Sequence, residues 1–376
     1  MKQALRKVWS VLWRLGLAGL LMAWAFHAIF HYQCRTVLRL QGIDLDALPR
    51  VDRWIQVWKL GPSQLAGTVL RVQPGWLAVS ILLWGVGITL GAWRWLLVLR
   101  SQGLELGIRR TLEISLVAHF FNSFLLGSTG GDVLKAYYAA RVTRHLKTEA
   151  VTTVFLDRVL GLFAMLVFAS VMIVANLPMV TAYWRTLALA AVILSMTAAA
   201  GGVLLVSLRG GVSNVLPGAR KWLQRLPKAD LLERGLGACR ALGRNPGLLL
   251  RSFAISIVLT VVCVYQLQTL AWGYGHDAPL RPMLLFVPAV ICISALPVTP
   301  SGLGVRDNLY LYLLSLPEVG IDPDSAVAIS LVAYAGGLVW TALGGVLYIL
   351  MRRETELAEA VAENRARPAA AVRGAP

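Results

Sequence analysis

Two short stretches bring glycine, hydroxyl and charged residues together within very apolar surroundings. A helix that begins just after a glycine turn points its free N–H groups and the positive end of its dipole at the space before it, which suits an anion. Hydroxyl groups can cap such a helix, and a lysine or arginine can hold a phosphate oxygen. We therefore predict that both stretches bind an anionic substrate. The residues are Thr129, Gly130, Gly131, Asp132 and Lys135 in "GSTGGDVLK", and Thr299, Pro300, Ser301, Gly302, Gly304, Arg306 and Asp307 in "VTPSGLGVRD".

The two stretches follow the same pattern. Placing Gly130 on Gly302 also puts Thr129 on Ser301, and each stretch lies between two long apolar segments. This predicts two similar units of opposite orientation, an inverted repeat, and transporters place substrate sites between such repeats. We expect the aspartate of each stretch to pair with its lysine or arginine when the site is empty. The alternative is that these four charges form structural salt bridges at the headgroup level.

A further charged pair, Asp157 and Arg158, lies in the apolar run "VFLDRVLGLF". Charged side chains inside membrane segments are costly and usually functional, so both join the predicted substrate-binding set. Adjacent residues point about 100° apart on a helix, which predicts separate partners, and we expect Asp157 to reach Lys135 or Arg141. Arg94, flanked by tryptophans in "GAWRWLL", is interpreted as an anchor that reaches the membrane surface.

The composition defines the elements that must position these residues. The chain has 376 residues, of which 57% are hydrophobic and 15% charged, with a mean hydropathy of +0.66. This excludes an ordinary soluble domain and predicts an all-helical polytopic membrane protein. A span takes about 20 apolar residues. We expect six spans, at about 9–31, 76–99, 155–178, 186–208, 251–272 and 326–350.

The apolar segments around the two glycine-rich stretches are shorter. We expect re-entrant helical hairpins at about 112–141 and 283–317, each returning to the side from which it entered. This arrangement keeps more lysine and arginine on the cytoplasmic side than eight full crossings do, as the positive-inside rule requires. The alternative for the first stretch is a helix that ends at a glycine in the interface. His119 and Asn122 are expected either to line the first hairpin or, for the histidine, to be satisfied within the core.

Several other features of the sequence limit the functions that the protein can have. Residues 1–351 form one predicted membrane domain with both termini cytoplasmic, and 352–376 form a predicted disordered tail. The net charge is +17, and the basic loop after residue 208 is expected to contact anionic lipid headgroups, because no nucleic-acid recognition module accompanies it. The four cysteines lie far apart, and no cluster of acids or histidines stands out. We therefore predict no catalytic residues, no metal site and no cofactor.

Three motifs carry a resemblance to a known family. In order and spacing, "GSTGGDVLKAYYAAR", "LDRVLGL" and "PVTPSGLGVRDNLYLYL" resemble the motifs of the lysylphosphatidylglycerol synthase transmembrane family, from about Trp76 to Met351. That family often has Glu where this chain has Asp157 and Asp307, and Arg where it has Lys135. The resemblance implies a lipid-translocating domain of a bacterial cytoplasmic membrane. The soluble lysyltransferase domain of the full synthase is not expected in the short segment after Met351.

We therefore expect a flippase rather than an enzyme. Its partners would be membrane lipids, either an anionic or zwitterionic phospholipid or a polyprenyl-phosphate-linked lipid. Two alternatives remain. One is a membrane enzyme that modifies a lipid headgroup, for which divalent-metal dependence is expected. The other is an accessory subunit of a lipid synthase.

Overall fold

The computed structural model describes residues 44–124, 130–142, 147–208, 245–295 and 305–372, together with positions 27, 30, 31, 34, 35 and 38. All regular secondary structure within these ranges is helical. Five helices are long and apolar enough to cross a membrane. They are α3 (Pro74–Ser101), α6 (Lys147–Ala175), α8 (Trp184–Leu208), α12 (Pro246–Gly273) and α15 (Pro323–Val372). These correspond to five of the six predicted spans, and the first, at 9–31, lies almost wholly outside the described residues.

Four shorter helices form two contacting pairs, called the first and second hairpin here, in the regions where re-entrant hairpins were expected. The first pairs α4 (Ile108–Phe124) with α5 (Gly130–Val142), and the second pairs α13 (Leu280–Ser294) with α14 (Val305–Leu314). At the start of α5, the Gly131 N–H donates to the side-chain oxygen of Asn122 at 2.8 Å. A side chain at Gly131 would also meet the backbone carbonyl of Ala118, so glycine allows the two helices to approach closely.

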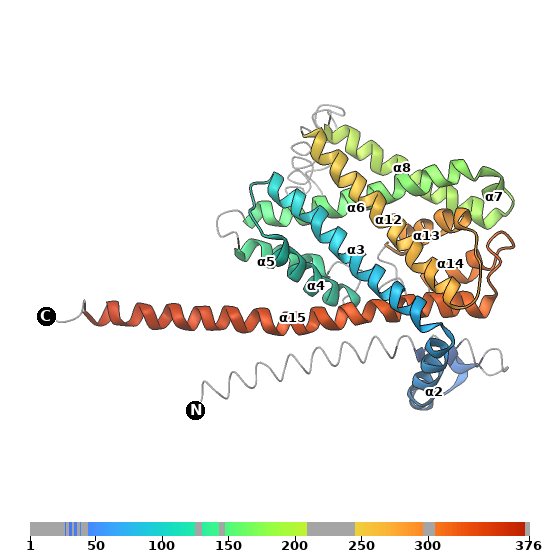
Figure 1. Ribbon diagram of the computed structural model, residues 1–376, viewed down its shortest axis with the longest axis horizontal. Coiled ribbons are helices and arrows are strands. Elements are labelled where there is room, and N and C mark those ends of the chain that lie inside the picture. Colours follow the sequence, from blue (N-terminus) through green and yellow to red (C-terminus); the bar gives the residue numbers. More distant parts are fainter. Residues whose placement is uncertain are drawn as a thin grey trace.

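The helices pack in a definite order around the hairpins. Helices α3 and α12 lie side by side through the centre of the molecule (Figure 1). The first hairpin packs through α4 against α15, and the second packs through α13 against α6. In turn, α5 contacts α6 and α14 contacts α15. The largest hydrophobic core joins α6, α8, α12, α13, α14 and α15, and a second core joins α3, α4, α5 and α6.

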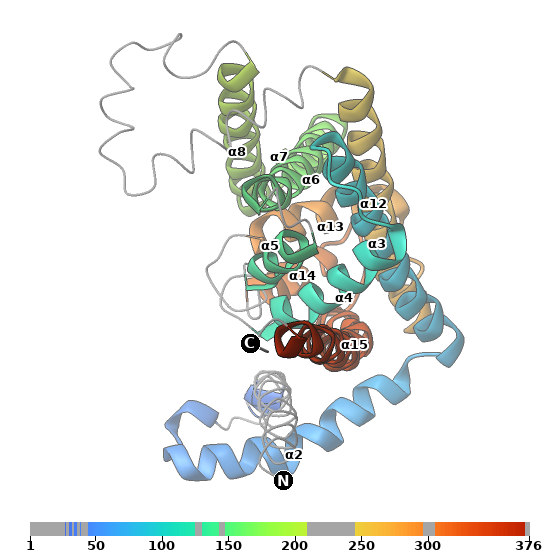
Figure 2. The same cartoon turned by 90° about the vertical axis from the view of Figure 1, so that its left-hand side faces the viewer.

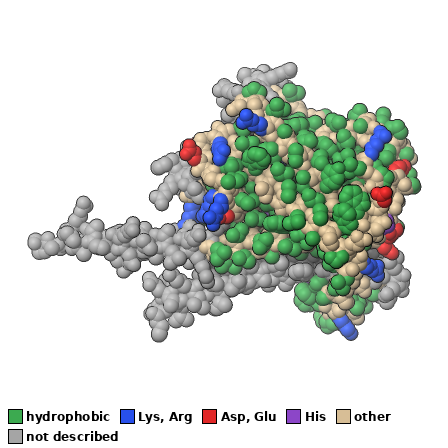
Figure 3. All heavy atoms as spheres, in the orientation of Figure 1, with side chains coloured by type: hydrophobic (Ala, Val, Ile, Leu, Met, Phe, Trp, Pro, Cys, Tyr) green, Lys and Arg blue, Asp and Glu red, His purple; other side chains and the backbone are tan. Residues whose placement is uncertain are grey.

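The outer surface agrees with a membrane environment. On the face shown in Figure 3, charged side chains gather at the two ends and hydrophobic side chains cover the middle. Large apolar side chains such as Leu82, Trp93, Val174 and Val203 are exposed on the long helices. A broad exposed apolar surface of this kind fits lipid and not water, so the chain is a multi-pass membrane protein.

One amphipathic helix lies apart from the bundle. Helix α2 (Arg50–Arg71) lies across α15, which is seen nearly end-on in Figure 2. Its Val57 is buried in a core shared with Leu331 and Leu338 of α15, whereas Val51 and Trp54 are exposed. An amphipathic helix with an exposed tryptophan, lying across a span, is typical of a helix that rests in the membrane interface.

The remaining elements are short, and one boundary differs from expectation. A 3-10 helix, η1 (Leu45–Ala47), precedes α2, and α7 (Leu177–Thr181) links α6 to α8. Helix α15 continues to Val372, over a segment that we expected to be a disordered tail. Alanine, glutamate and arginine are frequent there, and all three favour helix. The basic loop predicted to contact headgroups lies mostly in 209–244, outside the described residues.

Candidate functional site

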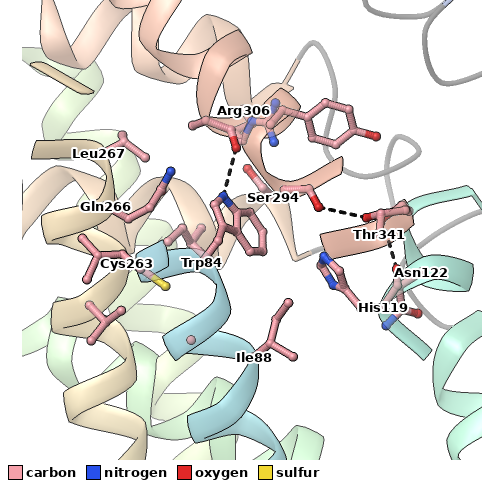
Figure 4. A pocket seen from close by; sticks show the side chains of 18 of the residues that line it. Trp84, Ile88, His119, Asn122, Cys263, Gln266, Leu267, Ser294, Arg306 and Thr341 are labelled. Carbon is pink, nitrogen blue, oxygen red and sulfur yellow. Dashed lines mark hydrogen bonds between the residues drawn. The ribbon is translucent and has the colours of Figure 1, made fainter. Parts of the chain in front are cut away.

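A cavity of about 460 Å³ lies between the two hairpins. Its walls come from α4 of the first hairpin, from α13 and α14 of the second, and from α3, α12 and α15. Figure 4 shows Arg306 on one side of this space, His119 and Asn122 from α4 on another, and Cys263 and Gln266 from α12 on a third. The lining also includes Trp84, Ile88, Ser123, Leu267, Ser294, Tyr310, Tyr334, Leu338 and Thr341.

Arg306 is the one charged side chain among the described residues that line this cavity. Its Nη2 donates to Asp307 at 3.0 Å, and its guanidinium stacks on the ring of Tyr334, 4.9 Å from the ring centre. The Asp307 side chain is fully buried and also accepts a hydrogen bond from the Ser330 hydroxyl. The Arg306 side chain, in contrast, keeps 15% of its surface exposed. The predicted pairing of Arg306 with Asp307 is confirmed, and the cation of the pair faces the cavity.

Neutral polar groups surround the rest of the space. The Ser123 and Thr341 hydroxyls share a hydrogen bond of 3.1 Å, and the Gln266 side chain donates to Ser80 at 2.9 Å. Asn122 uses its oxygen to accept from Gly131. The hydroxyl of Ser294 is buried and has no hydrogen-bond partner within the described part of the chain. A buried polar atom without a partner is costly, so a bound polar ligand would stabilise it.

A second polar cluster lies away from the cavity, where α3, α5 and α6 meet. Asp157 accepts from Arg94 Nε at 2.8 Å and from Lys135 Nζ at 3.5 Å. Arg94 also donates through Nη1 to Ser256 at 2.9 Å. All three charged side chains are nearly buried, with 11% of Arg94, 13% of Lys135 and 9% of Asp157 exposed. The predicted contact between Asp157 and Lys135 is confirmed.

The interpretation of Arg94 as a surface anchor is wrong. Its guanidinium points inward, because Asp157 and Ser256 compensate its charge inside the bundle. The space that it occupies depends on Gly161, where a Cβ would lie 2.5 Å from Arg94 Nη1. A snorkelling position needs no buried partner. The prediction relied on the tryptophans next to Arg94 in the sequence. It could not take account of Asp157 and Ser256, because these partners lie on other helices.

The remaining charged residues of the predicted set form another pair. Asp132 accepts from Arg158 at 2.6 Å, so α5 and α6 are linked by an ion pair. We expected Asp132 to pair with Lys135, but Lys135 is instead held by Asp157 and lies over the Trp95 ring. The expectation that Asp157 and Arg158 have separate partners is confirmed.

The described structure does not gather the whole predicted set at one cavity. Only Arg306 lines it directly, and Asp307 supports Arg306 from behind. Asp132, Lys135, Asp157 and Arg158 lie in the ion pairs around α5 and α6 instead. Gly130 and Gly131 begin α5, against α4. The other predicted residues, Thr129, Thr299, Pro300, Ser301, Gly302 and Gly304, lie outside the described ranges.

Several lining residues were not predicted. Gln266 is a polar residue in the middle of an apolar helix, and that feature alone could have marked it as functional. Tyr334 and Thr341 carry no comparable signal, because tyrosine and threonine are common in membrane helices. Asn122 and His119 were expected at the first hairpin, and both line the cavity.

The fold and this cavity define a multi-pass helical membrane protein with a polar-lined chamber between two helical hairpins. Within that class, a family model described as the lysylphosphatidylglycerol synthase TM region matches residues 53–344. The chain belongs to this family, as its three motifs indicated.

Relatives with the same general name occur in archaea. A UPF0104 membrane protein of Methanothermobacter thermautotrophicus is 22% identical over 288 residues, which cover 73% of this chain and 84% of the relative. A UPF0104 membrane protein of Pyrococcus horikoshii is 22% identical over 319 residues, covering 80% and 94%. The similarity therefore extends over most of both proteins, and the shared name states only that they are membrane proteins.

Proposed function

We propose that this protein is a lipid flippase that moves a lipid headgroup through the chamber between its hairpins. The observation that carries the proposal is the position of Arg306. A partly exposed cation faces a cavity whose other described lining residues carry no charge, inside an apolar bundle, and a phosphate group needs such a cation for its passage. The lipid chains would remain in the bilayer while the polar headgroup passes through the protein.

The helix packing supports an inverted repeat. The first unit would comprise α3 to α6, and the second α12 to α15. When the two units are exchanged, the contact of α4 with α15 becomes that of α13 with α6, and both contacts occur. The contacts of α5 with α6 and of α14 with α15 correspond in the same way, and α3 with α12 corresponds to itself. A pattern that is unchanged by exchange is what a pseudo-two-fold axis between the units produces.

The polar clusters also correspond. Lys135 of α5 contacts Asp157, 22 residues later, and Asp307 of α14 contacts Ser330, 23 residues later. Arg94 and Gln266 lie at matching places on the paired helices: each follows the first residue of its helix by 20 positions (94 − 74 and 266 − 246). Arg94 donates to a serine of α12, and Gln266 donates to a serine of α3. The two units thus carry similar polar networks built from different side chains.

These correspondences suggest how transport proceeds. In the described state, the network around Arg306 borders the open cavity, whereas its counterpart around Asp157 is closed by ion pairs. Exchange of the two conformations between the units would open the second network and close the first, which is alternating access. On this proposal the hairpins are re-entrant, the first span adds a sixth crossing, and both termini are cytoplasmic.

Reconstitution into proteoliposomes tests the function. We expect the wild-type protein to move fluorescent phosphatidylglycerol between leaflets without changing it, as checked by mass spectrometry. The double variant Arg306→Gln/Asp307→Asn should slow this at least tenfold, because a hydrogen bond to a charged group is worth about 1.5–3 kcal/mol. Neutralising both members avoids leaving Asp307 buried without its cation.

Arg281→Gln is the matched control. Arg281 also belongs to the second hairpin and is held by Asn176 at 2.6 Å, but it does not line the cavity. Its variant should transport lipid as the wild type does. Equal transport by the double variant at equal insertion would refute the site. A chemically altered lipid would favour the membrane-enzyme alternative, and no movement of any lipid would favour an accessory subunit.

A further inference from the structure

A second hollow lies at the end of the bundle where α3 begins and α12 ends. It measures about 400 Å³, is open to the outside, and is lined by Trp76, Trp272, Gly275, His276 and Asp277. We propose that it binds the ammonium group of a phospholipid headgroup. The hollow shares no lining residue with the chamber between the hairpins, and this inference does not depend on the proposed transport.

Backbone contacts fix the walls of this hollow. The Gln73 N–H, just before α3, donates to the Gly273 carbonyl at the end of α12 at 3.0 Å. A Cβ at Gly273 would lie 2.6 Å from Cγ2 of Val72 and 3.1 Å from Cβ of Trp76, so glycine lets the start of α3 lie directly against α12. Gly275 then adopts a φ of +83°, and this left-handed turn brings the next two residues into the wall. The fold therefore builds the site before any ligand binds.

Two indole rings form one side of the hollow. The ring centres of Trp76 and Trp272 lie 5.1 Å apart with their planes at 55°, and 36% of the Trp76 surface is exposed. The face of an indole attracts a cation, and ammonium groups are commonly recognised by aromatic rings that meet at an angle. Tryptophans at a membrane surface also serve as simple anchors, so the charge of the other side decides between the two roles.

The other side of the hollow carries negative charge. Asp277 is exposed and has no hydrogen bond or ion pair within the described part of the chain. His276 lies against Asp322, with its Nε2 3.0 Å from the carboxylate. No lysine or arginine is among the described residues that line the hollow. Even if His276 is protonated, the two carboxylates leave a net negative charge, which favours a cation over an anion.

The position of the hollow indicates a lipid as the source of the ammonium group. Helices α3 and α12 are long and apolar enough to cross a membrane, and their ends meet here, so the hollow lies at the level of the headgroups. Arg71, the last residue of α2, is exposed and directly precedes Val72, which packs against Gly273. Arg71 can hold a phosphate while the ammonium group lies between the indoles and Asp277. This arrangement fits phosphatidylethanolamine or phosphatidylcholine.

Photo-crosslinking in vesicles tests the site. The probes are phosphatidylethanolamine, phosphatidylcholine and phosphatidylglycerol with the same photoreactive acyl chain, each added in trace amounts to vesicles of unlabelled phosphatidylglycerol that contain the full chain. Mass spectrometry compares the labelling of residues 72–81 and 268–277 with that of α8, which exposes apolar side chains to lipid. We expect both ammonium lipids to label the two segments at least about fivefold more than phosphatidylglycerol does. Equal labelling by the three probes would overturn the proposal.

Substitutions in the lining assign the preference to this hollow. Asp277→Asn keeps the size of the side chain, deletes its charge and should remove most of the preference. Asp324→Asn is the matched control, because Asp324 is also exposed, lies at the start of α15 and does not line the hollow. Trp76→Leu should also lose the preference, whereas Trp76→Phe keeps a ring face and should retain part of it. Wild-type labelling of both Asp277→Asn and Trp76→Leu, or an equal loss in Asp324→Asn, would refute the site.

Two further arms separate a lipid from a soluble ligand and this site from the transport site. Soluble phosphoethanolamine at the concentration of the lipid probe should leave the labelling unchanged, and displacement would reassign the hollow to a soluble amine. Arg306→Gln/Asp307→Asn should keep the preference, because it changes only the chamber. Selective labelling of a wild-type protein that moves no lipid would refute the flippase alone. Transport with equal labelling by all probes would refute this site alone.

Discussion

Asp157→Ala should lower the free energy of unfolding by about 3–5 kcal/mol, because it leaves two buried cations without their counter-ion. Arg94 and Lys135 both contact this carboxylate, and neither has more than 13% of its side chain exposed. Removing one partner of a buried pair exposes the full desolvation cost of the other. Denaturant unfolding in mixed micelles measures the change, with wild type and variant at equal detergent concentration.

Two further variants show whether this loss of stability comes from the burial of the charges. Glu113→Ala removes a carboxylate that also pairs with two arginines, but one of these, Arg109, is 93% exposed. Its cost should stay below about 1 kcal/mol, as for surface ion pairs. The triple variant Arg94→Met/Lys135→Met/Asp157→Leu replaces all three charges by apolar groups and should recover most of the stability. An Asp157→Ala cost as small as that of Glu113→Ala would show that water or lipid headgroups reach the cluster.

Gly344→Ala should destabilise the contact between α15 and the first hairpin. A side chain at this position would meet the backbone carbonyl of Leu116 and, at 3.2 Å, the Cβ of Phe120. Backbone cannot move aside as a flexible side chain can, so α15 and α4 must separate. Overpacking of this kind costs about 1–3 kcal/mol and exceeds the gain of up to about 1 kcal/mol in helix propensity. The same unfolding assay measures the difference.

Gly202→Ala is the matched control for this substitution. Gly202 also lies within a long apolar helix, but nothing lies within 4 Å of a Cβ built there. The alanine should therefore stabilise α8 slightly, by up to about 1 kcal/mol. The two substitutions are chemically identical and have opposite expected signs. If both stabilise the protein, α4 and α15 are not in close contact in the membrane.

The long spans were predictable because hydropathy depends on local composition, and five of them appear in the expected regions, although α6 begins eight residues before its expected bound and α15 continues well beyond its own. The helix pairs of both hairpins followed from glycine-rich breaks between short apolar runs. Contacts between helices were harder to predict. Arg94 and its partner Asp157 are 63 residues apart, and no local pattern indicates that α3 and α6 face each other there.

The candidate site was also predictable in its local features and not in its contacts between helices. Arg306 was identified because a charged residue in an apolar context is conspicuous in any sequence. Lys135 could have paired with either Asp132 or Asp157. The packing of α5 against α6 decides in favour of Asp157, and the sequence does not show that packing. Tyr334 contributes through its ring beneath Arg306, and that role arises from the meeting of α14 and α15 in space.

The neutrality of the Arg306–Asp307 pair has a consequence for energy supply. The empty pair carries no net charge, so a bound headgroup with one negative charge would give the loaded site a charge of −1. A charge that crosses the full membrane potential changes in energy by about 2.3 kcal/mol per 100 mV. On the proposed function, an inside-negative voltage would therefore drive such lipids outward. A potassium diffusion potential across proteoliposomes should shift their leaflet distribution, and reversing its sign should reverse the shift.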